Sequence, residues 1–142
     1  MKKLMLVLTV VFFLLGLTAC GGGGKYGDVK DVMNEMIGAQ EKFAASCENI
    51  SNADDAVAAL NGFAATMETL APKMKEVMEK HSEIQKQEPP EELKPLSEKM
   101  EAAQKKMQVA MQKLAAYQQD PKVQEAQMKL FGAMAKMAPE QK

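Results

Sequence analysis

Residues 53–84, with the sequence ADDAVAALNGFAATMETLAPKMKEVMEKHSEI, decide the fold. Apolar side chains return every three to four positions, which is the period of one face of an α-helix. This stripe consists of Ala53, Val57, Leu60, Phe63, Met67, Leu70, Met74, Val77, Met78, His81 and Ile84. Asn52 can cap the start, and Pro89-Pro90 ends the pattern. We predict one long helix, kinked at Pro72 but not divided there.

The same period continues on both sides of this stretch. The preceding stripe is Val29, Val32, Met33, Met36, Ile37, Gln40, Phe43, Ala44, Cys47 and Ile50. The next is Leu93, Leu96, Met100, Ala103, Met107, Met111, Leu114 and Tyr117, with Pro95 in the first turn of the helix. The last, after Asp120-Pro121, is Val123, Ala126, Leu130, Met134 and Met137. Residues 28–142 are therefore expected to form an all-α domain, an antiparallel up-down four-helix bundle with coiled-coil-like packing.

Helix lengths suggest how these four helices fit together. The second and third patterns are about 35 and about 30 residues long, and the first and fourth are about 20. Short helices can cover only one half of a long hairpin, so we expect the opposite tip, residues 79–98, to protrude. In a hairpin centred on Pro89, Met78 would face Met100 and Met67 would face Met111. His81 would then be half-exposed near the tip.

The first twenty residues have the organisation of an export signal. Lys2 and Lys3 precede an apolar run from Leu4 to Leu15, which spans only about 18 Å as a helix. This is too short for a bilayer core of about 30 Å but suits a secretory leader. Leu17-Thr18-Ala19-Cys20 follows the run.

Leu17-Thr18-Ala19-Cys20 resembles the lipobox of bacterial lipoproteins. The resemblance implies a signal peptide over residues 1–19, then cleavage and lipidation at Cys20 with acyl chains such as palmitate. Gly21, in place of aspartate, is the pattern usually read as sorting to the outer membrane, on its periplasmic side. Residues 20–27 would then be a lipidated, glycine-rich spacer. An ordinary signal peptide with a chance cysteine is the alternative.

The composition argues against several classes of function. All 18 basic residues are lysine, the formal net charge is −1, and there is no tryptophan. The chain therefore lacks the arginines and stacking platforms of nucleic-acid-binding proteins. With one histidine and no nucleophile–base pair in the sequence, we expect no enzyme and no catalytic residue. The expected partners are the membrane, through the lipid anchor, and an envelope protein; a homo-oligomer is also possible.

Eleven methionines remain after the leader, and they allow three interpretations. Thioethers can form a soft core, because methionine fills irregular gaps. They can line a pliable groove for a partner. They can also bind Cu(I) or heme. For this last alternative we single out Met33, Met74, Met107 and Met134, which the bundle geometry brings to similar heights, together with His81.

The leading hypothesis is a membrane-anchored, non-enzymatic helical protein of the cell envelope with a structural or interaction role and no cofactor. Its contact surface would be the hairpin tip or the methionine-lined core. Cys47 lies on the inner stripe of the first helix, so its thiol is either buried or pairs between chains. Lys142 is similar to the wall-linked terminal lysine of the murein lipoprotein family, which makes a cell-wall tether a further hypothesis.

Overall fold

The structure is a computed structural model, and it describes residues 24–82 and 90–137. Four α-helices make up most of these residues: α2 (Gly27–Glu48), α3 (Ala53–Lys80), α4 (Lys94–Ala115) and α5 (Pro121–Ala135). A single 3₁₀ turn, η2 (Glu91–Leu93), leads into α4. No strand occurs in the described part of the chain. The prediction of an all-α domain is confirmed.

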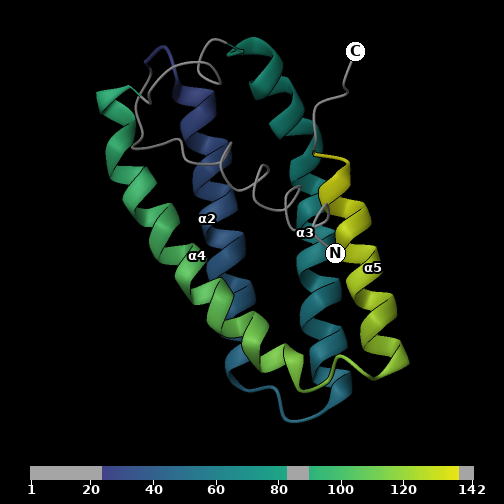
Figure 1. The fold of residues 1–142 in the computed structure, drawn as a ribbon. Coiled ribbons are helices and arrows are strands. Elements are labelled where there is room, and N and C mark those ends of the chain that lie inside the picture. Colours follow the sequence, from purple (N-terminus) through teal and green to yellow (C-terminus); the bar gives the residue numbers. More distant parts are fainter. Residues whose placement is uncertain (1–23, 83–89, 138–142) are drawn as a thin grey trace, which may run out of the picture.

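Two helices, α3 and α5, begin where the sequence indicated. Asn52 caps α3, because its Oδ1 accepts a hydrogen bond of 2.9 Å from the backbone N–H of Asp55. Asp120 caps α5 in the same way through the N–H of Lys122, also at 2.9 Å, with Pro121 at the first position of the helix. α3 continues through Pro72, and Figure 1 shows its C-terminal part inclined to the rest.

The helix lengths differ from those expected. α3 has 28 residues and ends at Lys80, where His81 takes the C-cap position. α4 has 22 residues, the same number as α2. Residues 83–89, including Ile84 and Pro89, lie outside the described part of the chain. Because α2 is as long as α4, the physical basis for a hairpin protruding beyond the shorter helices is lost.

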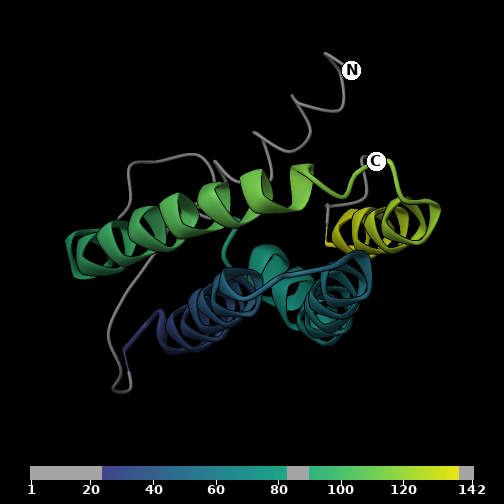
Figure 2. The same ribbon diagram turned by 90° about the horizontal axis from the view of Figure 1, so that it is seen from below.

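The helices pack in the spatial order α4, α2, α3, α5 (Figure 1). α2 contacts α4 on one side and α3 on the other, and α3 also contacts α5. Seen from below, α4 lies beside α2 and α5 beside α3, and the two outer helices stay apart (Figure 2). Among the described residues, α3 and α4 do not form an extended interface, although they are consecutive in the chain.

Ion pairs between neighbouring helices show their relative directions. Lys106 bonds Glu41 and Lys113 bonds the carbonyl oxygen of Glu48, both across 65 positions, so α2 and α4 are parallel. Lys122 with Asp54 and Lys136 with Glu68 are both 68 positions apart, so α3 and α5 are also parallel. α2 and α3 are antiparallel, since the separation grows from 38 for Lys73–Glu35 to 52 for Lys80–Asp28.

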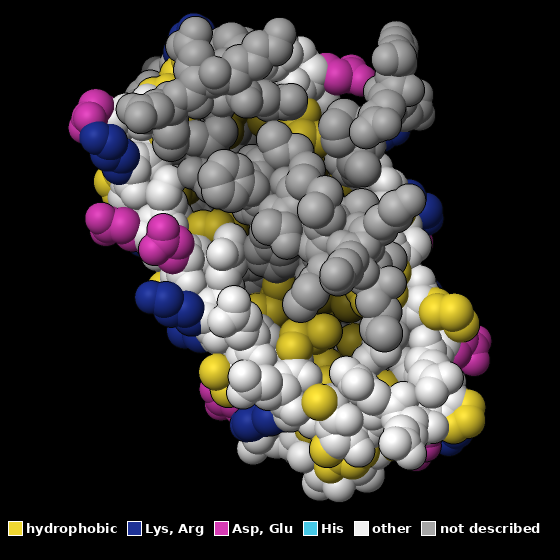
Figure 3. Space-filling view, viewed as in Figure 1, with side chains coloured by type: hydrophobic (Ala, Val, Ile, Leu, Met, Phe, Trp, Pro, Cys, Tyr) yellow, Lys and Arg dark blue, Asp and Glu magenta, His cyan; other side chains and the backbone are white. Residues whose placement is uncertain are grey.

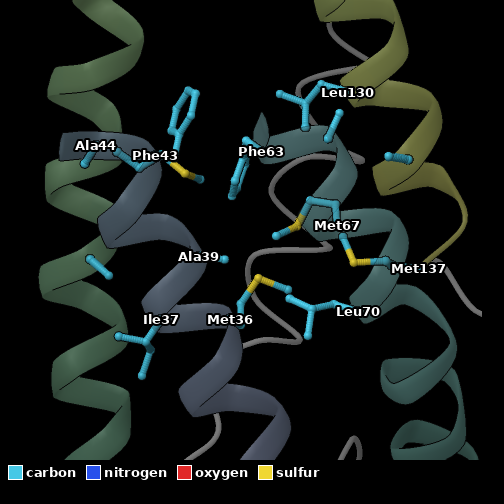
Figure 4. Packing of buried hydrophobic residues seen from close by; sticks show 14 of the residues in the cluster. Met36, Ile37, Ala39, Phe43, Ala44, Phe63, Met67, Leu70, Leu130 and Met137 are labelled. Atoms are coloured by element: carbon cyan, nitrogen blue, oxygen red, sulfur yellow. The ribbon is translucent and has the colours of Figure 1, made fainter. Parts of the chain in front are cut away.

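One hydrophobic core runs through all four helices. Phe43 of α2 and Phe63 of α3 stack near its centre, with ring centroids 4.6 Å apart and an interplanar angle of 24°. Figure 4 shows this pair above Met36, Met67 and Leu70, whose side chains come from the same two helices. Burial of such large side chains provides most of the driving force for folding.

The expected packing of α3 directly on α4, with Met78 opposite Met100 and Met67 opposite Met111, is not what the structure shows. α4 lies on α2 instead, where Lys106 and Lys113 find acceptors. The apolar stripe of α4 fits either neighbour, so helical spacing alone could not choose between them.

Candidate functional site

A polar cluster joins the start of α2 to the end of α3. The Nε2 of His81 lies 2.9 Å from Oδ1 of Asp28, and the Nζ of Lys80 lies 2.5 Å from its Oδ2. Tyr26 meets the His81 ring edge-on, with centroids 5.4 Å apart. The Lys80 ammonium holds the pKa of Asp28 down at about 2, assisted by His81 and opposed by partial burial.

His81 is therefore not the half-exposed residue that the protruding tip implied. It is 7% exposed, because Tyr26 and the first turn of α2 reach as far as the end of α3 and cover it. Its Nε2 is engaged by Asp28. Axial coordination of heme iron through that nitrogen would require this hydrogen bond to break.

Two rows of lysines connect each outer helix to its inner neighbour. Lys106 and Lys113 of α4 are seven positions apart, as are the α2 residues that they contact, Glu41 and Glu48. A seven-residue repeat keeps side chains on one edge of a helix, so these contacts recur every two turns. Exposed pairs of this kind contribute little stability, but they are consistent with one register of α4 on α2.

The α3–α5 interface repeats this design. Lys122 and Lys136 of α5 bond Asp54 and Glu68 of α3 at 2.9 and 2.8 Å. The nearby Lys136 ammonium lowers the pKa of Glu68. Sequence reasoning missed both rows, although the heptad spacing of lysine in the third and fourth helices was a signal that could have found them.

The same contacts fix the heights of the candidate metal ligands. Met33 and Met74 lie at similar heights, because Glu35 of α2 bonds Lys73 of α3 at 2.8 Å. Both methionines are buried, with exposures of 5% and 6%. The structure thus brings one pair of the predicted residues to the same level.

Met107 lies at a different height. It follows Lys106, which bonds Glu41 of α2, so it is about 13 Å along the helix axis from Met33 at 1.5 Å per residue. The sequence prediction placed these two methionines at one level, and the structure shows that this was wrong. The error arose from pairing α4 with α3 instead of α2.

Met134 is likewise distant from Met74. It lies two positions before Lys136, which bonds Glu68 of the parallel helix α3, so it is about 12 Å from Met74 along the axis. Met134 is partly buried. His81 lies at the end of the bundle where α2 begins, beyond the height of all four methionines. The five predicted metal ligands therefore do not form one site.

Three other methionines do share a height. Met36 of α2, Met67 of α3 and Met137, just after α5, have exposures of only 2%, 1% and 3%. Figure 4 shows their side chains turned toward the same part of the core, together with Leu70. This convergence depends on how far α5 is displaced along α3, and the spacing of apolar residues in the sequence does not determine that displacement.

Gln40 adds a polar group to this part of the core. Its side chain is 1% exposed, and its Oε1 is a buried oxygen for which the described part of the chain supplies no hydrogen-bond donor. Leaving such an acceptor unpaired is costly, and native proteins rarely do so without a reason. In the sequence Gln40 is one member of an apolar stripe, and no local signal distinguishes it.

Cys47 is buried with no measurable exposure and forms no disulfide in the structure. Burial raises the pKa of its thiol to about 11, although the Lys113 ammonium acts in the opposite direction. The thiol is therefore protonated at neutral pH and a poor nucleophile. Of the two alternatives that the sequence left for this thiol, burial or pairing between chains, the structure shows burial. The expected lipidation site, Cys20, lies outside the described residues.

The face between α4 and α5 is hydrophobic. Figure 3 looks onto this face, and in its lower half apolar side chains gather in a hollow between the two outer helices. Met111 of α4 and Met134 of α5 are both partly buried against the core. Met111 lies roughly 140° around α4 from Lys106, on the edge turned away from α2. Met134 lies roughly 160° around α5 from Lys136, on the edge turned away from the α3 acids.

Within residues 24–82 and 90–137, no helix has the length and apolar character needed to cross a membrane. The same residues contain no cluster of three or more histidine, cysteine, aspartate or glutamate side chains suited to a metal ion. No protein-family model, no curated protein and no solved structure matches this chain.

Proposed function

We propose that this chain is a lipid-anchored protein of the bacterial cell envelope that acts by binding a partner and not by catalysis. The lipobox that ends at Cys20 supports export and anchoring, at the outer membrane on its periplasmic side. The observation that carries the binding role is the hydrophobic face between α4 and α5, two helices that do not pack on each other in the described residues. Contiguous apolar surface of this kind is typical of interaction sites.

The contacts of His81 suggest how the domain stands on the membrane. Cys20 and Gly27, the first residue of α2, are seven positions apart, so the spacer reaches at most about 25 Å. His81 bonds Asp28 at this same end of the bundle. In this proposal the domain is an antiparallel up-down bundle in which His81, at the end of α3, and the turn η2 before α4 lie toward the membrane. The turns at 49–52 and 116–120 lie away from it.

This orientation moves the proposed contact surface. The end of α3 and the start of α4, which flank the predicted tip, would be next to the membrane, where a periplasmic partner has poor access. The hollow in Figure 3 extends toward the opposite end of the bundle. Met111 lies on the edge of α4 turned away from α2, and Met134 lies on the edge of α5 turned away from the α3 acids. Flexible thioethers suit a surface that must adapt to a partner.

Photo-crosslinking in cells tests this function. A photoreactive amino acid at Met111 or Met134 is expected to give the same discrete adduct with an envelope protein. Met128 is the matched control, because it is 68% exposed and lines an outer groove between α3 and α5 with Val57 and Lys122. The proposal fails if positions 111 and 134 give no adduct, or if position 128 gives the same one.

A further inference from the structure

The three converging methionines lie within about two helical turns of one another in the core. Phe63 stacks on Phe43, and Met67 is one turn beyond Phe63, so it lies between the heights of Met36 and Gln40 in the antiparallel helix α2. Met36, Met67 and Met137 are 2%, 1% and 3% exposed. Figure 4 shows Met36 and Met67 directed into the space between α2 and α3.

Met137 reaches this height from α5. It directly follows Lys136, whose partner is Glu68, the residue after Met67. Because α3 and α5 are parallel, Met137 lies about two residues, or roughly 3 Å, from Met67 along the axis. Figure 4 shows its side chain reaching from the end of α5 toward α3, close to Met67 and Leu70. Three helices or helix ends thus each contribute one sulfur.

Gln40 is the second and independent observation. It is one turn after Met36 on the same face of α2, and its buried Oε1 lacks a donor among the described residues. An unpaired carbonyl oxygen is stabilised by a cation as well as by an N–H or O–H group. A core of thioethers explains apolar packing but does not explain this oxygen.

We propose that Met36, Met67 and Met137, with the amide oxygen of Gln40, form a binding site for a soft monovalent cation, Cu(I) or its analogue Ag(I). Thioethers are soft, neutral ligands that select Cu(I) over hard divalent cations. An amide oxygen is a known weak additional ligand in copper sites. The site is separate from the surface proposed for partner binding, and neither depends on the other.

Thioether ligation makes a specific prediction about pH. Thiol and imidazole ligands must lose a proton to bind a metal, whereas a thioether carries none. Affinity at the proposed site should therefore be constant from about pH 5.5 to about pH 7.5, unlike a site that uses histidine or a thiol. If Cys47 or His81 were a ligand, the affinity for the metal would instead change with pH.

The test is a Cu(I) titration of the mature, lipidated protein in detergent, in competition with a Cu(I) chelator. Wild type is expected to bind one equivalent of Cu(I). Met36→Leu, Met67→Leu and Met137→Leu should each weaken binding at least tenfold. Loss of a residue that only supports a metal ligand already costs about tenfold, and loss of a ligand should cost no less. Leucine conserves volume, so the fold is retained. Met33→Leu and Met74→Leu are matched controls, because they make the same change in the same core at another height.

Ag(I) provides a second measurement that does not depend on the variants folding equally well. It should raise the thermal midpoint of wild type and of Cys47→Ala alike, because binding to the native state stabilises it. The proposal is overturned if wild type binds neither ion. It is also overturned if the Met33 and Met74 variants weaken binding as much as the three site variants, or if Cys47→Ala or His81→Ala abolishes it.

Discussion

The imidazole Nε2 of His81 lies 2.9 Å from Oδ1 of Asp28, which joins the residue after α3 to the first turn of α2. The ring is nearly buried, whereas the carboxylate is one-third exposed, with a side-chain exposure of 33%. The anchored end of the proposed bundle is therefore closed by a specific polar contact and not by apolar packing alone.

Removal of this carboxylate should destabilise the protein. Asp28→Ala leaves the buried His81 ring without its acceptor and Lys80 without its partner, so the free energy of unfolding should fall by about 1–3 kcal/mol. Urea denaturation followed by circular dichroism measures the change. Glu91→Ala removes the exposed Glu91–Lys94 pair and should change the free energy by less than about 0.5 kcal/mol. Equal effects of the two variants would contradict the role given to Asp28.

The low pKa of Asp28 predicts how stability depends on pH. The folded protein holds this pKa at about 2, below the ordinary value of 3.8. Because the folded value is lower, the stabilisation is fully present above pH 3.8 and is lost as the pH falls toward 2. Asp55 and Glu68 have lowered pKa values too, so stability should continue to fall with acid in Asp28→Ala, but less steeply. Parallel urea-midpoint curves for wild type and Asp28→Ala would refute this.

The apolar core should be far more sensitive to truncation than the surface. Leu60 is completely buried in α3, so Leu60→Ala should lower the free energy of unfolding by about 2–5 kcal/mol. Val109 is 55% exposed on α4, and Val109→Ala should change it by less than about 0.5 kcal/mol. Thermal and urea denaturation measure both, and a small effect at Leu60 would show that the core is packed differently.

Cys47 should be inert in the folded protein. Its thiol is buried and its pKa is raised to about 11, so a thiol reagent should modify it only after unfolding. The rate of reaction with a chromogenic disulfide, with and without denaturant, measures this. Rapid reaction in native buffer would mean that the thiol is accessible.

The elements of the fold that depend on local chemistry could be predicted from the sequence. Asn52 and Asp120 cap α3 and α5 because their side chains bond backbone N–H groups two or three residues away. Pro95 and Pro121 lie in first turns, where the missing N–H is tolerated. These interactions involve residues close in sequence, so no knowledge of the tertiary arrangement was needed.

The choice of neighbouring helices could not be predicted in the same way. The apolar stripe of α4 could face α3 or α2, and hydrophobic burial is not directional. Lys106 and Lys113 bond α2, but their acceptors lie 65 positions away. The height of Met107 follows from this arrangement, so the prediction that placed it beside Met33 failed. The burial of His81 has another cause, because Tyr26 and the start of α2 cover the end of α3. Gln40 could not be identified either, because its unpaired oxygen becomes evident only when the surrounding core is known.

Mass spectrometry of the protein purified from its native membrane tests the central claim, a lipid-anchored helical domain, most directly. The account predicts a mature chain that begins at Cys20, with a diacylglycerol on the sulfur and an acyl group on the amino terminus. A chain that retains residues 1–19 and carries no lipid would contradict it.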